Sequence, residues 1–118
     1  MKKILAIAFL PLAMLLLLSA TRPVDKKPLV LIFSKTNGFR HSSIPVGIEA
    51  IKKLGEANGF DVNTTEDSLA FNKKNLKKYA AIIFLSTTGK VFGPDQEKAL
   101  QEYIHHGGGY VGIHAATD

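Results

Sequence analysis

The sequence predicts an α/β fold built on a mostly parallel β-sheet. Two continuous apolar runs, Leu29–Phe33 and Ala80–Leu85, are typical of strands that are buried on both faces. Helical patterns separate the predicted strands in the order β-α-β-α-β-α-β, and neighbouring parallel strands need such crossover helices. The chain has 118 residues, of which the first 20 resemble an export signal, so it can form one small domain.

The amino terminus has the order of an export signal. A pair of lysines precedes the apolar run Ile4–Leu18, and the small residues Ser19–Ala20 follow it. A helix of that length spans roughly 22 Å, which is less than the ~30 Å core of a bilayer. We therefore expect residues 1–20 to be a signal peptide and residues 21–28 a linker. The mature protein would be exported, periplasmic or extracellular, and an uncleaved membrane anchor is the alternative.

The first helix is predicted to end at Gly59. Ser42 or Ser43 can cap its start, and Pro45 suits its first turn. Apolar residues recur at helical spacing as one stripe: Ile44, Ile48, Ile51 and Leu54.

Four further elements complete the pattern. Alternation over residues 60–64 predicts a strand near the sheet edge. Asn72 can cap a short basic helix that runs through Lys78, and Gly93–Pro94 open a third helix. The last strand is predicted over Tyr110–Ile113. The apolar face of the third helix contains Leu100, Tyr103 and Ile104.

The composition excludes several classes of protein. Hydrophobic residues make up 46% of the chain and charged residues 21%, which is typical of a globular domain. The chain has no cysteine, which excludes a thiolate nucleophile, a cysteine-ligated zinc site and a disulfide within it. Without the two signal lysines, 13 basic side chains face 10 acidic ones, so the net charge falls from +5 to +3. Nucleic acid is therefore not an expected partner.

Two predicted loops offer polar side chains at the carboxyl ends of strands, where such sheets bind ligands. Arg40 and His41 lie where a helix begins, and its free N–H groups suit a carboxylate, a phosphate or a sugar hydroxyl. Alternatively, both are solvated loop residues. The hydroxyls that follow the strand over residues 80–85 can bind an oxygen-rich ligand or simply satisfy open backbone groups. The candidate substrate-binding residues are Arg40, Ser86, Thr87 and Thr88.

A third segment, GGGYVGIHAATD, adds His114 and Asp118 at the same end of the sheet. Gly112 inside its strand predicts a close approach of another group to the backbone. If the two apolar strands flank the last one, His41 and His114 lie within side-chain reach. Two imidazoles and the carboxylate of Asp118 could bind a divalent metal, or act as acid and base on a sugar hydroxyl or carbonyl. Alternatively, His114 bonds a backbone carbonyl and Asp118 plays no part.

These motifs resemble those of the trehalose-utilisation (ThuA-like) family. The strings VLIFSKTNGFRHSSI, AAIIFLSTTG and HHGGGYVGIHAATD carry the resemblance, in the same order, over Leu29–Asp118. The resemblance implies a flavodoxin-like, class I glutamine amidotransferase-like three-layer sandwich with a parallel sheet. It also implies a role in the metabolism of trehalose, related disaccharides or keto-sugars. The site residues that it carries over are His41, Thr87, Thr88, His114 and Asp118.

The expected function is that of an exported protein that binds or processes a small carbohydrate. Glutaminase chemistry is not expected, because the turn that carries a catalytic cysteine in the amidotransferases reads His114, Ala115, Ala116 here. A non-catalytic carbohydrate-binding or accessory module is the alternative. A third hypothesis is that the chain is a flavodoxin-like protein that binds a cofactor, with the phosphate of the cofactor in the SKTNG loop.

The family that the chain resembles has longer members, so we expect this sequence to represent the N-terminal part of the domain. The predicted strand Tyr110–Ile113 would then have an apolar, unpaired edge. Such an edge favours self-association of the chain.

Overall fold

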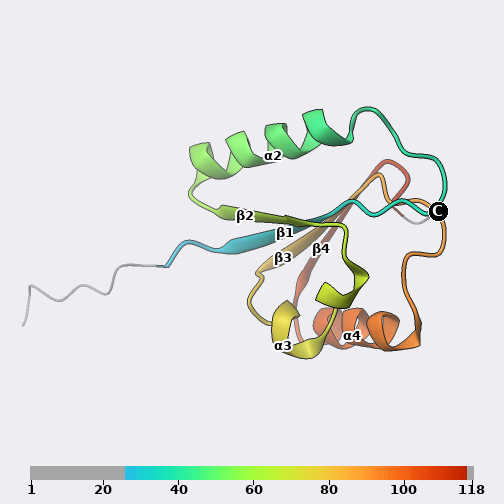
Figure 1. Ribbon diagram of the computed structural model, residues 1–118. Helices are drawn as coiled ribbons and strands as arrows, with labels where there is room; N and C mark the ends of the chain where they lie inside the picture. The colour runs from blue at the N-terminus through green and yellow to red at the C-terminus, as the bar shows by residue number, and fades with distance from the viewer. Residues whose placement is uncertain (1–25, 117–118) are drawn as a thin grey trace, which may run out of the picture.

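A computed structural model describes residues 26–116, which form a parallel β-sheet between two layers of helices (Figure 1). The strands are β1 Leu29–Phe33, β2 Asp61–Thr65, β3 Ala81–Leu85 and β4 Gly109–Ile113. The helices are α2 Ile44–Asn58, the short 3₁₀ helix η1 Ser68–Ala70, α3 Lys73–Leu76 and α4 Pro94–His105. Helix α2 covers one face of the sheet, and α3 and α4 lie on the other. The predicted α/β class and its three-layer, flavodoxin-like architecture are confirmed.

The strand order is β2-β1-β3-β4, and every neighbouring pair is parallel. The two apolar runs form the central strands β1 and β3, as their sequences predict. The expectation that these two strands flank the last strand is wrong, because β3 lies between β1 and β4. Pairing the two most apolar strands with each other shields both from water and leaves β2 and β4 at the edges.

Side chains of β1 alternate between two apolar cores. Phe33 points to the α3–α4 side, where the rings of Phe71, Phe84 and Phe92 surround it at centroid distances of 4.6 to 5.3 Å. Ile32 points to the other side and packs in the core beneath α2. Edge-to-face, tilted and stacked ring pairs of this kind contribute roughly 0.5 to 1.5 kcal/mol each beyond the burial of their area.

The start and the stripe of helix α2 differ from the prediction. Ser43 occupies the N-cap position, but its side chain makes no capping hydrogen bond, and the first turn contains the predicted proline. Leu54 is 56% exposed and does not join the stripe. Gly55 is the buried residue there, because a Cβ at its position would lie 2.6 Å from the carbonyl oxygen of Phe60.

Helices α3 and α4 follow their predicted starts. The Asn72 side chain accepts a hydrogen bond from the backbone N–H of Asn75, and Gly93 is the N-cap of α4. Ile104 was expected on the apolar face of α4 but is exposed, whereas Leu100 and Tyr103 pack against the core. The Tyr103 hydroxyl donates to the carbonyl oxygen of residue 79 over 3.1 Å, which fixes α4 against the start of β3.

Part of the predictions falls outside the described residues. Residues 1–25, which include the expected signal and most of the linker, lie outside them, and so does Asp118. Across residues 26–116, no helix has the length and apolar character that crossing a membrane requires.

Candidate functional site

The candidate site lies at the carboxyl ends of β1, β3 and β4, where three loops are bonded to one another. The backbone N–H of Asn37 donates to the carbonyl oxygen of Thr88 over 2.8 Å, and Thr36 forms an isolated parallel bridge with Thr88. The N–H of Ser86 donates to the carbonyl oxygen of Ile113 over 3.0 Å. These backbone bonds hold the loops after the three strands in one fixed arrangement.

His41 and His114 meet in this arrangement. Their ring centroids lie 4.4 Å apart at an interplanar angle of 72°. His41 is half-buried in the loop before α2, and His114 is exposed directly after β4. The exposed ring of Phe39 lies 4.9 Å from the His41 ring and stands nearly perpendicular to it. The predicted proximity of the two histidines is confirmed, although the strand order assumed for it is not.

The backbone of His114 has a left-handed conformation, with φ of 58°. A non-glycine residue in this region typically costs about 1 to 3 kcal/mol and persists only where the surrounding structure holds it. A tight turn holds it here, because the N–H of Ala116 donates to the carbonyl oxygen of His114 over 2.7 Å. A Cβ at Gly112 would lie 3.0 Å from the Cβ of Ala116, so the glycine predicted to allow close approach makes room for this turn.

The three candidate hydroxyls are buried rather than open to solvent. Ser86 is 2% exposed, and Thr87 and Thr88 are each 3% exposed. The Thr88 hydroxyl donates to the carbonyl oxygen of Phe39 over 2.8 Å, and the Thr87 hydroxyl donates to that of Ala115 over 3.4 Å. The two threonine hydroxyls therefore satisfy backbone groups, which is the alternative that the sequence analysis left open. Their bonds position the two loops that carry His41 and His114.

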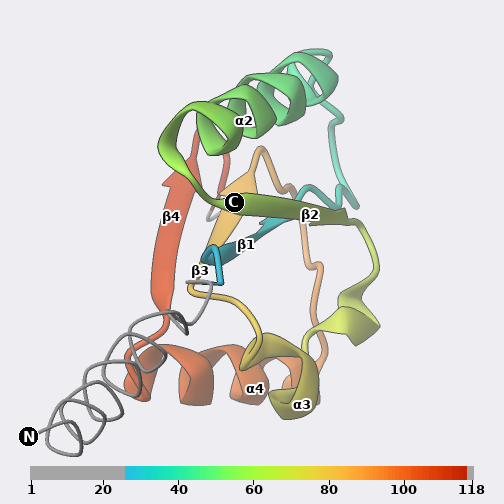
Figure 2. The same cartoon turned by 90° about the vertical axis from the view of Figure 1, so that its left-hand side faces the viewer.

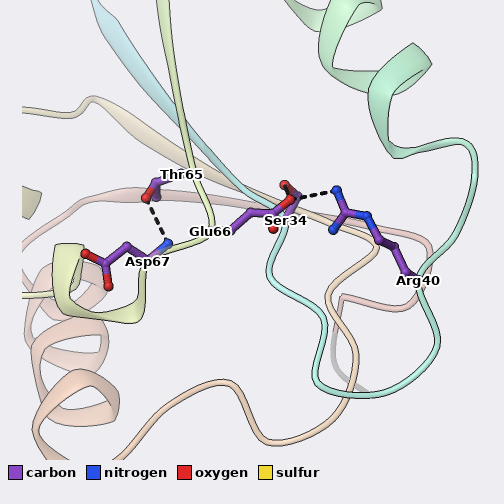
Figure 3. Close-up of polar contacts among 5 residues, drawn as sticks. All are labelled: Ser34, Arg40, Thr65, Glu66 and Asp67. Carbon is purple, nitrogen blue, oxygen red and sulfur yellow. Dashed lines mark hydrogen bonds and ion pairs between the residues drawn. The ribbon is translucent and has the colours of Figure 1, made fainter.

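Arg40 forms an ion pair that the sequence analysis missed. Its Nη2 lies 2.7 Å from Oε1 of Glu66, in the segment after β2, and the Ser34 hydroxyl points to the same oxygen at 3.5 Å (Figure 3). Both partners of the ion pair are about half-exposed. The signal that could have shown it is the acidic pair Glu66–Asp67 directly after a strand, at the same end of the sheet as Arg40.

The described residues bring two imidazoles together. Among residues 26–116, no three His, Cys, Asp or Glu side chains cluster closely enough to hold a metal ion. Asp118, the predicted third member, lies outside this range. Its predicted role as an acid, a base or a metal ligand therefore stays a prediction.

A cavity of about 410 Å³ lies at the opposite end of the sheet. Leu76 and Tyr103 contribute to its walls between α3 and α4, and Ala80 and Gly108 precede β3 and β4. It is separate from the histidine pair. We place the candidate site at the carboxyl ends because the loops there bring the rings of His41 and His114 into contact.

Comparison with known proteins identifies two similarities. The family model described as ThuA, trehalose utilisation, matches residues 29–118. The crystal structure of a ThuA-like protein from Bacteroides uniformis ATCC 8492 is similar to this chain, with a TM-score of 0.63 and 27% sequence identity. The similarity covers 82% of this chain and 40% of the Bacteroides chain, so this chain spans less than half of that protein's length. No curated protein matches the sequence.

Proposed function

Because the chain belongs to the ThuA, or trehalose utilisation, family, we propose that it binds trehalose, a related disaccharide or a keto-sugar at the carboxyl ends of its strands. The observation that carries the proposal is the His41–His114 pair, with its rings 4.4 Å apart. The loops hold the two imidazoles together, and the backbone of His114 is strained in a left-handed conformation. Strain of this kind is concentrated at functional sites in proteins.

The two imidazoles supply the groups that sugar chemistry needs. A neutral imidazole has one N–H donor and one acceptor nitrogen, so the pair can bond neighbouring hydroxyls of one sugar. In a reactive complex, a neutral ring takes the proton of a sugar hydroxyl, while the other ring, in its protonated imidazolium form, gives its proton to a carbonyl or leaving oxygen and becomes neutral. The exposed Phe39 ring offers an apolar surface beside His41.

Carbohydrate binding without turnover is the second candidate. It is favoured by the absence, among the described residues, of a third metal-ligating or acidic side chain clustered with the two imidazoles. Carbohydrate processing and carbohydrate binding without turnover both predict that the chain binds a sugar. Only the first predicts that the sugar is converted to a product. In the catalytic case, loss of His114 abolishes turnover, whereas in the binding case only affinity changes.

Calorimetric titration with trehalose tests the proposal. We expect saturable heat for the unmodified chain, and a loss of affinity of about tenfold or more in His114→Ala, since the lost group bonds the ligand directly. His106→Ala is the matched control, because His106 lies at the end of α4, outside the site. Equal affinity in the two variants, or no saturable heat with any disaccharide tested, would contradict the proposal.

Export of the chain is part of the same proposal. It is supported by the order of two lysines, an apolar run and small residues at the amino terminus. Mass spectrometry of the protein from the periplasm of a bacterial host should show a chain that begins near residue 21. An intact chain that retains Met1 and is recovered from the cytoplasm would count against export.

A further inference from the structure

The cavity between α3 and α4, here called the α3–α4 cavity, lies at the opposite end of the sheet from the proposed sugar site. Figure 2 shows the two helices side by side on one face of the sheet. The volume of the cavity is about 410 Å³, and cavities that bind small molecules typically have volumes of about 300 to 1,000 Å³. The α3–α4 cavity is therefore large enough for a ligand with one or two rings.

Two consecutive glycines, Gly107 and Gly108, form one wall of the cavity. Gly107 has a φ of 90°, a left-handed conformation that favours glycine and that turns the chain after α4. A Cβ at Gly108 would lie 2.3 Å from the Tyr103 ring, so the absence of a side chain lets this ring pack against the backbone. The wall therefore consists of backbone and an aromatic ring, and no side chain at positions 107 and 108 fills the space.

The other walls contribute apolar groups. Leu76 lines the cavity from α3, Ala99 lines it from α4, and Ala80 lines it from the segment before β3. The Tyr103 hydroxyl is already bonded, because it donates to the carbonyl oxygen of Tyr79 over 3.1 Å. Tyr103 therefore presents its ring to the cavity, and a ligand that fills this space needs an apolar body.

Cationic side chains outnumber carboxylates around the cavity. Lys73 and Lys77 line it one helical turn apart, and Glu102 is the one carboxylate among its lining residues. Lys73 and Glu102 also line a neighbouring shallow pocket together, whereas Lys77 is not among the residues of that pocket. Within residues 26–116, no carboxylate lies within ion-pair distance of Lys77. Lys77 is therefore a cation at the cavity that no neighbouring carboxylate neutralises.

The carboxyl end of α4 does not offset this positive charge. Carbonyl groups in the last turn of a helix attract cations where they are left unbonded. Here the carbonyl oxygens of Glu102, Tyr103 and Ile104 accept hydrogen bonds from the N–H groups of residues 106–108, over 2.9 to 3.0 Å. Because these carbonyl groups are satisfied, the cavity favours an anionic ligand over a cationic one.

We propose that the α3–α4 cavity binds a small carboxylate whose apolar body contains an aromatic ring. The body lies beside the Tyr103 ring and Ala99, and the carboxylate pairs with the ammonium group of Lys77, which is exposed at the solvent side of the cavity. Trehalose has neither an apolar body nor a negative charge. The cavity is thus a second site, for a different class of ligand from the sugar.

Two probes of nearly equal shape test the proposal: indole-3-acetate and its neutral counterpart, indole-3-acetamide. In an NMR titration of the full 118-residue chain, indole-3-acetate should bind with a Kd of roughly 0.1 to 1 mM, as the affinity per atom of small ligands allows. The amide should bind about threefold or more weakly, because it lacks the charge that pairs with Lys77. Equal affinities of the two probes, or no saturable binding of indole-3-acetate, would overturn the proposal.

The amide signals of the glycines report where the probe binds. Gly107 and Gly108 line the cavity, so their signals should shift along one saturable curve. Gly38 and Gly89, in the loops of the proposed sugar site, should not respond, and saturating trehalose should leave the affinity for indole-3-acetate unchanged. Shifts confined to Gly38 and Gly89, or displacement of the probe by trehalose, would contradict binding in the cavity. None of these measurements requires that the chain bind sugar, so the two proposals fail separately.

Three variants locate the contact. Ala99→Leu fills part of the cavity and should weaken the binding of both probes about tenfold or more. Lys77→Gln should weaken the binding of indole-3-acetate about threefold or more and change that of the amide by less than about twofold. Lys74→Gln is the matched control, because Lys74 belongs to the same helix but does not line the cavity, and it should change both affinities by less than about twofold.

Melting temperatures close to that of the unmodified chain show which variants fold. Lys77 is exposed, so Lys77→Gln decides the question even where Ala99→Leu does not fold. Undiminished binding of indole-3-acetate to a folded Ala99→Leu variant would overturn the proposal. Equal effects of Lys77→Gln and Lys74→Gln on the binding of indole-3-acetate would overturn it as well.

Discussion

The rings of His41 and His114 lie 4.4 Å apart although the strands that precede them are not neighbours in the sheet. His41 follows β1, His114 follows β4, and β3 lies between these strands. The contact depends on the loop after β1, which crosses the carboxyl end of β3 and is bonded there to Thr88. The loop after β3 therefore acts as the support on which the two histidines meet.

Removal of the Thr88 hydroxyl tests this support. Thr88→Val keeps the shape of the side chain but removes the hydroxyl that donates to the carbonyl group of Phe39. We expect the free energy of unfolding to fall by about 0.5 to 1.5 kcal/mol. Thr88→Ser keeps the hydroxyl, so its free energy of unfolding should fall by less than that of Thr88→Val. Equal stability of the valine variant and the unmodified chain in urea unfolding would show that the bond to Phe39 is unimportant.

The strain at His114 gives a second prediction. Glycine adopts a φ of 58° without a steric penalty, whereas alanine does not. We therefore expect His114→Gly to be more stable than His114→Ala by about 1 kcal/mol, although neither has an imidazole. Urea unfolding of the two variants measures the difference. A glycine variant less stable than the alanine variant would mean that the left-handed conformation is not a source of strain.

The ion pair of Arg40 and Glu66 separates a structural role from a binding role. Because both side chains are about half-exposed, Arg40→Ala should lower the free energy of unfolding by less than about 1 kcal/mol. If Arg40 binds substrate, as the sequence predicts, Arg40→Ala weakens trehalose binding while Glu66→Gln, which leaves the cation in place, does not. Equal effects of the two variants on binding would assign Arg40 a positioning role only.

Tyr103 predicts a dependence of stability on pH. Burial raises the pKa of its hydroxyl above the ordinary value of 10.0. The folded state therefore retains the proton that the unfolded state loses, so this contribution is complete below pH 10.0 and declines as the pH rises toward the folded-state pKa. Tyr103→Phe lacks this contribution. The stability advantage of the unmodified chain over Tyr103→Phe should shrink above pH 10.0, and a constant advantage would contradict the assignment.

Much of the fold could be predicted because the apolar runs at residues 29–33 and 80–85 are too continuous for surface strands. The strand order could not, because several parallel orders bury the same two runs. The exposure of Leu54 also escaped prediction, since helical spacing does not show that Gly55, and not Leu54, is the buried residue beside Phe60. These are properties of tertiary packing, and helical periodicity does not report them.

The sequence also predicted part of the candidate site. The shared end of the sheet was enough to bring His41 and His114 together, because parallel strands gather their carboxyl-terminal loops. The partner of Arg40 was not predictable from spacing, since Glu66 follows a different strand. The sequence also does not show that the Thr88 hydroxyl is buried. It bonds the carbonyl oxygen of Phe39, which lies within reach only in the folded loop.

The most direct test of the account is a long-range proton–nitrogen NMR titration that resolves the four imidazoles of the chain. The account predicts that trehalose shifts the ring nitrogens of His41 and His114 together, along one saturable binding curve. His105 and His106, at the end of α4, serve as internal controls and should not move. Shifts confined to those two controls, or equal small drifts of all four histidines, would show that the pair at the carboxyl ends of the strands is not the sugar site.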